Sequence, residues 1–204
     1  MADTKRQVLE RIIKNGEGWT FTPASFADVA DPRVIGVVLG RLTKEKKIQR
    51  IARGLYSFPK QHPKFGALHP EIQEIVEAIA RKDNLRVIAS GAYAANLLGL
   101  SEQVPAKIVF LTDGKSRKVK IGKNTIELKK ASPKQLSLSG TEAGIVIQAL
   151  RYIGKNYIDK VLSKKLRDKL SRKTKKTLLE HLAAVPAWMR PVLKEISGEG
   201  RGNE

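Results

Sequence analysis

The sequence contains no cysteine, which excludes disulfides, thiolate metal sites and thiol nucleophiles. It also lacks long apolar runs, because no stretch approaches the roughly 18 apolar residues that a membrane-spanning helix requires. No signal peptide opens the chain. These absences lead us to expect a cytoplasmic protein that has no membrane partner.

Acidic residues are few relative to basic ones. The chain of 204 residues has 39 Lys and Arg against 20 Asp and Glu, a formal net charge of +19. The excess is uneven: residues 1–60, 101–140 and 141–204 carry +6, +6 and +7, whereas residues 61–100 are neutral. A nucleic acid or another anionic partner is therefore expected, bound on distinct surfaces. The length leaves room for one or two domains.

Residues 19–59 have the pattern of a winged helix-turn-helix, within a DNA-binding domain over 1–60. Apolar residues at helical spacing predict helices over 4–14 and 33–47, with a short helix over 23–29 between them. Thr22 and Asp31 are capping residues, each followed by proline at the first helical position. Residues 48–51 and 55–58 are predicted strands, joined by a turn that contains Gly54. The alternative is a small helical domain with an ordinary basic surface.

The helix predicted over 33–47 has two unlike faces when residues advance by about 100° each. The apolar face holds residues 34, 35, 38, 39 and 42. The opposite face consists of Arg33, Gly36, Val37, Gly40, Arg41, Lys44 and Lys47. Each interior glycine costs about 0.5–1 kcal/mol of helix stability relative to alanine. Two explanations for the glycines stay open, namely close approach to a DNA groove and close packing of another helix.

We predict that this helix and the hairpin after it bind double-stranded DNA, with cations neutralising phosphates. Arg33, Arg41 and Lys44 are the candidates to reach base edges in the major groove, whereas the hairpin arginines are expected at the DNA backbone or the minor groove. Thr20 and Thr22 could donate hydrogen bonds to phosphate, although Thr22 is equally explained as a helix cap. The predicted DNA-binding residues are Arg33, Gly36, Gly40, Arg41, Lys44, Lys47, Arg50 and Arg53.

A linker is predicted over 61–69 and a second domain over 70–196. Helices are expected over 70–81 and 91–98, and strands over 86–89, 107–111, 117–121 and 125–129, with a turn at 122–124. Further helices are expected over 141–153, 158–170, 174–184 and 188–196, followed by a flexible tail over 197–204. The predicted fold class is α+β: an N-terminal winged helix-turn-helix, then a mixed α/β domain with a helical C-terminal part.

A dense cationic run lies near the C-terminus, where eight of the thirteen residues from Lys164 to Lys176 are Lys or Arg. Leu162, Leu166 and Leu170 recur every four residues, which predicts a helix with a cationic exterior. The run is a solvated surface, a second contact to DNA phosphate, or a patch for an acidic partner or RNA. Its basic residues are Lys164, Lys165, Arg167, Lys169, Arg172, Lys173, Lys175 and Lys176.

No arrangement typical of an enzyme stands out. Residues 114–116, Gly-Lys-Ser, match the end of a phosphate-binding loop, but Val109 stands where that loop needs glycine. Asp113 and Glu127 could form a carboxylate pair, without signs of a two-metal site. The histidines lack metal-ligand spacing, and the serines lack a basic partner. These residues are His62, His69, His181, Ser90, Ser101 and Ser116. We therefore expect no catalytic residues, no metal and no cofactor.

Several segments resemble a known family. They are RLTKE at 41–45, RIARGLY at 50–56, SGAYAANLLGLSEQVPAK at 90–107 and FLTDG at 110–114. These segments are similar to the AbiEi-type antitoxins of bacterial type IV toxin–antitoxin and abortive-infection systems. The resemblance covers most of residues 5–155, and residues 90–114 are its most distinctive part.

The resemblance implies a protein that binds inverted repeats upstream of its own operon and represses it. It also implies a C-terminal domain that counters a nucleotidyltransferase-like toxin, often without a stable complex. Composition and periodicity alone predict only DNA binding and an unassigned second domain. The alternatives are an RNA- or ribosome-associated basic protein, and an enzyme that acts on the toxin or on nucleic acid through the central domain.

Overall fold

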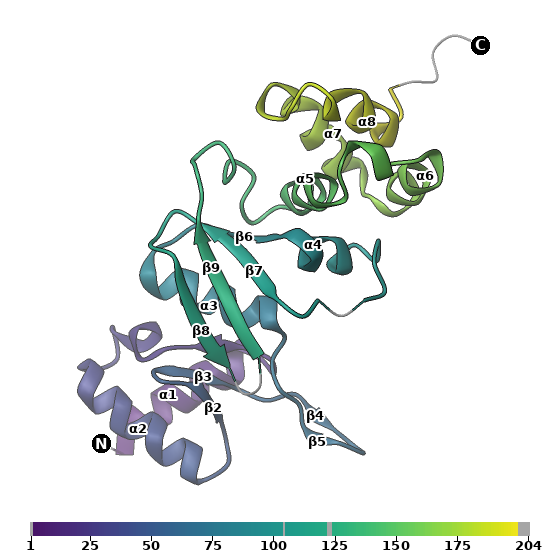
Figure 1. Ribbon diagram of the computed structural model, residues 1–204. Coiled ribbons are helices and arrows are strands. Elements are labelled where there is room, and N and C mark those ends of the chain that lie inside the picture. The colour runs from purple at the N-terminus through teal and green to yellow at the C-terminus, as the bar shows by residue number, and fades with distance from the viewer. Residues whose placement is uncertain (1, 104, 122–123, 200–204) are drawn as a thin grey trace. The chain divides into compact units, whose positions relative to one another are not determined.

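The computed structural model describes residues 2–103, 105–121 and 124–199 of the chain (Figure 1). The chain forms two compact units. The first contains the residues up to Leu85 together with Lys120, Ile121 and Asn124, and the second contains Arg86–Val119 and the residues from Thr125 on. Both units contain helices as well as strands, which confirms the predicted α+β class. Within the described ranges, none of the helices combines the length and apolar character needed to cross a membrane.

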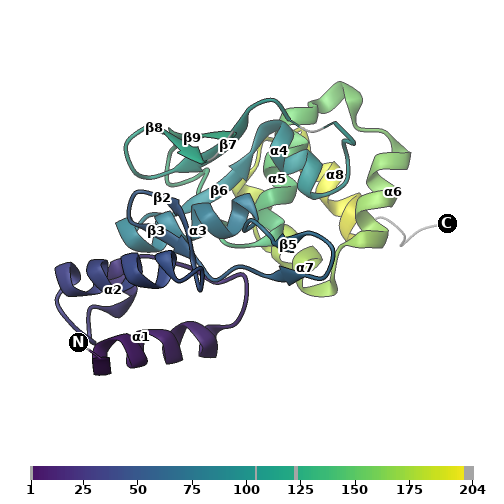
Figure 2. The same cartoon turned by 90° about the horizontal axis from the view of Figure 1, so that it is seen from below.

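The first unit begins with the elements of a winged helix. Two helices, α1 and α2, lie side by side (Figure 2). Strands β1, β3 and β2 form an antiparallel sheet in that order. The short β1 was not predicted, since two residues are too few to show an alternating pattern. The bounds are α1 Ala2–Asn15, β1 Thr20–Phe21, the 3₁₀ helix η1 Pro23–Phe26, α2 Pro32–Lys44, β2 Gln49–Ala52 and β3 Leu55–Ser57.

Apolar side chains from all these elements make one core. Ile12 of α1, Leu39 of α2 and the rings of Phe21 and Phe26 are fully or almost fully buried. The rings of Phe21 and Phe26 meet edge to face with centroids 5.6 Å apart, a favourable aromatic geometry. Rigid packing of this kind fixes the rotation of α2 about its own axis, so its unburied face has a defined direction.

A charged clamp holds α1 to the segment just before α2. Both terminal nitrogens of Arg11 donate to the Asp28 carboxylate, each at 2.6 Å, and one also donates to the carbonyl of Ser25. These hydrogen bonds from Arg11 lower the pKa of Asp28 to about 2. The two parallel N–H···O bonds add directional specificity to the α1 contact.

The first unit extends beyond the predicted domain boundary at residue 60. The predicted linker contains a hairpin of β4 (Gln61–His62) and β5 (Gly66–Ala67), and α3 (Ile72–Asp83) follows it. Ile75 and Ala78 of α3 form a buried cluster with Leu55 of β3. The α3 helix therefore belongs to the first unit, whereas the sequence analysis placed it in the second domain. The boundary lies after Leu85, and the packing of Ile75 and Ala78 on Leu55 ties α3 to the first unit.

The second unit is built on a mixed four-stranded sheet of order β6-β7-β9-β8. Strand β7 pairs antiparallel with β6 and parallel with β9. Each strand lies within one or two residues of its predicted range, although the predicted turn at 122–124 is described only from Asn124 on. The bounds are β6 Val87–Ser90, α4 Gly91–Leu97, β7 Ile108–Thr112, β8 Arg117–Ile121 and β9 Asn124–Lys130.

Helices complete the second unit. Helices α6 and α7 both pack against α8. The cationic run does not form one helix, because Ser171 caps a new helix by accepting a hydrogen bond from Thr174 N. The predicted tail over 197–204 lies partly outside the described residues. The bounds are α5 Glu142–Ile153, η2 Lys155–Tyr157, α6 Lys160–Lys169, α7 Arg172–Glu180, η3 Leu182–Ala184 and α8 Met189–Ser197.

The first turn of α5 packs so closely that only glycine fits at position 144. A Cβ at Gly144 would overlap the carbonyl oxygen of Leu138 and lie 2.5 Å from the Ile88 Cδ1 atom. We expect Gly144→Ala to lower the free energy of unfolding by about 1–3 kcal/mol through overpacking. Urea denaturation measures this change.

Gly36→Ala is the matched control, because an added methyl there meets no atom within 4 Å outside its own helix. That control should stabilise the protein by about 0.5–1 kcal/mol. Equal stability of the Gly144→Ala and wild-type proteins would contradict the packing explanation.

Candidate nucleic-acid interface

Helix α2 begins and ends through local signals in its sequence. The Asp31 carboxylate accepts a hydrogen bond from Arg33 N at 2.8 Å, and Pro32 occupies the first helical position. The helix ends at Lys44. The chain then turns at Lys46, whose φ is 58°. Arg41 and Lys44 lie in the last turn, where cations interact favourably with the helix dipole.

The predicted division of α2 into two faces matches the burial of its side chains. Ile35, Val38, Leu39 and Leu42 are buried in the core of the first unit. On the opposite face, Val37 is 51% exposed. The cations Arg33, Arg41 and Lys44 of that face are exposed as well.

The two glycines of α2 have open space in front of them. A methyl group at Gly36 or Gly40 would meet no atom of the described chain within 4 Å apart from its own helix. Packing of another helix within the described chain therefore does not explain these glycines. Together with the exposed cations, they form a face on which an anionic body can approach the helix backbone. We call Arg33, Gly36, Val37, Gly40, Arg41 and Lys44 the glycine–cation face.

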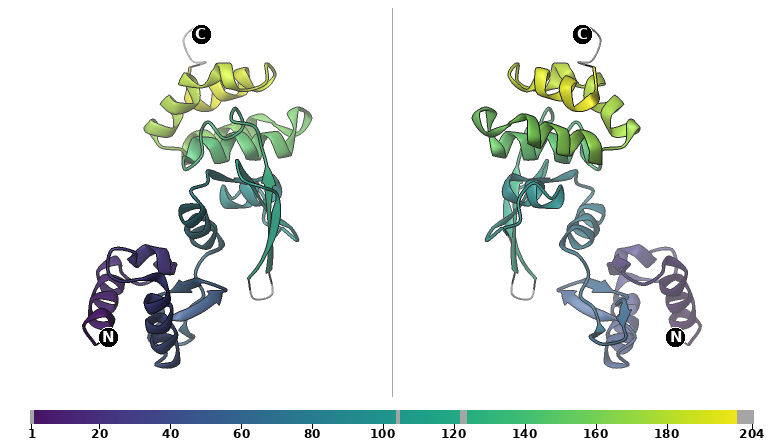
Figure 3. Two further views of the ribbon diagram at one scale, coloured as in Figure 1. Left: turned by 90° about the vertical axis from the view of Figure 1, so that its left-hand side faces the viewer. Right: turned by 90° about the vertical axis from the view of Figure 1, so that its right-hand side faces the viewer.

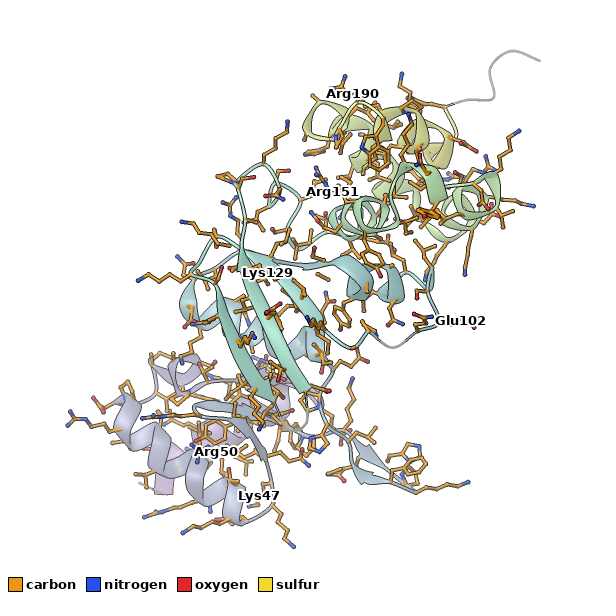
Figure 4. All side chains as sticks on the ribbon, in the orientation of Figure 1. Lys47, Arg50, Glu102, Lys129, Arg151 and Arg190 are labelled. Carbon is orange, nitrogen blue, oxygen red and sulfur yellow. The ribbon has the colours of Figure 1, made fainter. Side chains whose placement is uncertain are left out.

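Lys47 departs from the prediction. It was placed on the helix, but it lies in the turn between α2 and β2 (Figure 4). Its Nζ atom is 3.2 Å from the Glu45 carboxylate, which also accepts a hydrogen bond from Lys5. The hydrogen bond from Lys5 and then that from Lys47 lower the pKa of Glu45. Lys47 thus forms an ion pair with Glu45, which also pairs with Lys5.

The β2–β3 hairpin presents the other predicted cations. Arg50 is exposed on β2, and Arg53 is exposed at the turn, where Gly54 adopts a φ of +70°. Figure 3 shows this hairpin beside α2 from two sides. The hairpin thus lies next to α2 as the wing of a winged-helix fold does.

Thr20 and Thr22 do not fit the suggested role of phosphate donors. Their exposed fractions are only 2% and 3%. The hydroxyl of Thr20 donates to the carbonyl of Gly18, and the backbone N–H of Thr22 donates to the hydroxyl of Ser25. Thr20 belongs to β1, and Thr22 is the residue directly before η1.

The second basic patch is divided between α6 and α7, and part of it has an internal role. The ammonium groups of Lys165 and Lys169 donate to the carbonyls of Gly99 and Leu98, at the C-terminal end of α4. Cations at this end of a helix satisfy carbonyls that lack helical partners. Two of the eight predicted cations are therefore structural, and the eight do not form one continuous helix face.

The two candidate carboxylates bind cations separately. Asp113 accepts hydrogen bonds from the backbone N–H and the Nε of Arg86, both at 2.9 Å, and the side-chain bond is the larger cause of its lowered pKa. Glu127 lies between Lys118 and Lys129, at 3.8 and 3.5 Å. The two carboxylates therefore do not form the pair considered from the sequence.

Two of the three histidines and the three serines occupy structural positions. His62 accepts hydrogen bonds in the β4–β5 hairpin, and His181 contacts the carbonyl of Thr177. Ser101 and Ser116 accept bonds from backbone N–H groups, while Ser90 is the residue before α4. No group of three or more His, Asp or Glu side chains in the described ranges is placed to hold a metal ion.

Sequence analysis missed a groove next to the C-terminal end of α2. Its volume is about 460 Å³, and Lys46 and Arg50 line it together with Ala67 of β5 and His69. It joins the end of α2 to the base of the β4–β5 hairpin. No local pattern in the sequence predicts this groove, because its lining residues come from the end of α2, the β2 strand and the β4–β5 hairpin.

Comparison with known proteins gives a family without an assigned function. No curated protein matches the chain. Residues 7–178, which include the winged helix and most of the second unit, match a family of unknown function (DUF6088), and the chain belongs to this family.

Proposed function

We propose that this protein is a sequence-specific DNA-binding repressor, and that it acts as the antitoxin of a type IV toxin–antitoxin system. The observation that carries the DNA-binding part is the glycine–cation face of α2, which is exposed and has open space over both glycines. The antitoxin part rests on the resemblance of residues 90–114 to AbiEi-type proteins.

The glycine–cation face suits the major groove of B-DNA, which is wide enough to admit an α-helix. Gly36 and Gly40 would let the helix backbone come close to the DNA, because at these two positions no side chain projects from the helix. Arg41 lies one residue from Gly40 and is exposed, so its guanidinium can reach a guanine edge. An arginine that pairs bidentately with guanine discriminates against other bases by about 1–3 kcal/mol.

Contacts to DNA phosphates would come from the C-terminal end of α2 and from the wing. Lys44 closes α2, and Arg50 and Arg53 lie on the wing. No ion pair of these three side chains occurs among the described residues, so their charges are available to phosphates. Neutralising several phosphates releases counterions, and affinity should therefore fall steeply as salt increases.

The described part of the segment that carries the antitoxin resemblance, residues 90–103 and 105–114, lies in the second unit. It begins at β6, continues through α4 and ends after β7. Tyr93 of α4 packs on Phe110 of β7 with ring centroids 5.4 Å apart. Arg86 binds Asp113 at the end of the segment. We propose that this unit counters the toxin, separately from the DNA-binding surface.

The DNA-binding proposal is tested by titrating the full-length protein with its own upstream intergenic DNA and with a shuffled control. We expect a marked preference for the native DNA at about 0.15 M salt, and a loss of about 1–3 kcal/mol of that preference in Arg41→Ala. Uniform weakening would make Arg41 a phosphate contact. Equal binding of both DNAs at every salt concentration would refute the repressor, and tighter binding of structured RNA would favour the RNA-associated alternative.

Gly40→Ala separates helix stability from DNA contact. The substitution should raise the free energy of unfolding by about 0.5–1 kcal/mol, because alanine favours the helix and meets no neighbour. It should weaken binding to the upstream DNA about tenfold, because the added methyl would overlap a closely approaching groove. Unfolding curves and fluorescence anisotropy measure the two effects. If oligomeric state changes while DNA affinity does not, helix packing between two copies explains the glycine instead.

The antitoxin part is tested by co-expression with a nucleotidyltransferase-like toxin encoded beside this gene. We expect the wild-type protein to restore growth, and Arg41→Ala to restore it equally when both are expressed from an unrelated promoter. Growth arrest in the presence of wild-type protein at matched expression would contradict the antitoxin proposal and leave the DNA-binding proposal standing.

A further inference from the structure

The β4–β5 hairpin projects from the first unit and buries almost nothing (Figure 1). Phe65, at its tip, is 76% exposed. Two antiparallel pairs, Gln61 with Ala67 and His62 with Gly66, form its ladder. Because the hairpin is exposed, packing against the core does not hold it. An isolated two-stranded hairpin is only marginally stable in water, so other contacts must hold its shape.

The tip is nevertheless held in one shape. The Nδ1 atom of His62 accepts hydrogen bonds from the backbone N–H groups of Lys64 and Phe65, at 3.1 and 3.3 Å. The imidazole also lies against the Phe65 ring, with centroids 4.8 Å apart. Gly66 adopts a φ of +67°, which suits glycine in a turn. The exposed phenyl ring is thus positioned in advance, which lowers the entropic cost of inserting it into a partner.

The charge around the tip favours an anionic partner. Residues 60–70 contain Lys60 and Lys64 and no Asp or Glu. Lys60 lies 3.5 Å from Glu74, whereas Lys64 has no ion pair among the described residues. The groove lined by Lys46 and Arg50 reaches Ala67 at the base of the hairpin. Cations therefore lie at two places, Lys46 and Arg50 in the groove beside the base of the hairpin and Lys64 next to Phe65 at the tip, whereas the Glu17 carboxylate accepts a hydrogen bond from the backbone of Gln61 at the base.

We propose that the β4–β5 hairpin is a second DNA-binding element, which inserts Phe65 from the minor groove between two base pairs and bends the duplex. This inference rests on the proposed DNA-binding function. With α2 in the major groove, an element further along the duplex meets the minor groove, whose width of about 6 Å admits a narrow tip. Apolar side chains inserted there unstack a base step and kink the DNA, while a neighbouring lysine contacts phosphate.

The test uses the full-length protein and its own upstream DNA, labelled with a fluorophore at each end. Anisotropy gives the dissociation constant, and energy transfer between the ends gives the bend. The variants are Phe65→Ala, Phe65→Leu and the control Tyr157→Ala, which removes an equally exposed ring, 77% accessible, from the second unit.

We expect Phe65→Ala to bind about tenfold more weakly and to lose most of the bend, because an aromatic ring stacked on a base contributes about that factor. Phe65→Leu should keep most of the affinity and bend, since leucine is also an apolar wedge. Tyr157→Ala should behave as wild type.

The hairpin proposal is overturned if Phe65→Ala binds and bends the upstream DNA as wild type does. It is also overturned if affinity falls while the bend is unchanged, because Phe65 would then act outside a base step. If the wild-type protein binds no DNA, both this inference and the repressor proposal are wrong. If it binds with preference and bends DNA without needing Phe65, only the hairpin inference fails.

Discussion

The arrangement of the first unit depends on the burial of one side of α2. Ile35, Leu39 and Leu42 enter a core that already contains the edge-to-face rings of Phe21 and Phe26. Since each of these side chains is almost completely enclosed, a rotation of α2 would expose apolar area at about 25 cal/mol per Å². The direction of Gly36, Gly40 and the exposed cations is therefore a consequence of the core. The same packing places the wing beside the helix.

Periodic segments of this chain could be predicted closely, whereas features set by tertiary contacts could not. Helix α2 and strands β6 to β9 have regular apolar spacing, and the sequence located them within a few residues. The separate helices predicted over 158–170 and 174–184 allowed for the break at Ser171, but the cationic run across it was described as one helix because Leu162, Leu166 and Leu170 repeat every four residues. The place of α3 escaped prediction, because its apolar face would suit either unit.

The residues of the candidate site could largely be predicted from the sequence, whereas their surroundings and contacts could not. The exposed face of α2 follows from its helical wheel, but the open space over Gly36 and Gly40 depends on neighbours that no wheel contains. The burial of Thr20 and the pairing of Lys47 with Glu45 likewise arise from residues distant in sequence or from the end of the helix. A count of Lys and Arg in the sequence also overstates the number of cations available to a partner, because tertiary contacts occupy some of them. Lys165 and Lys169, for example, donate hydrogen bonds to carbonyls at the end of α4.

The first unit is not a continuous stretch of chain, because Ile121 packs against the cluster of Leu55, Ile75 and Ala78. During synthesis, this unit lacks part of its apolar cluster until the ribosome has released the chain beyond Ile121. The helix that carries the glycine–cation face is made early, yet its unit becomes complete only after strands β6 and β7 of the second unit have also been made. A nascent or truncated chain that ends at Leu85 therefore lacks one of the contacts that the finished first unit has.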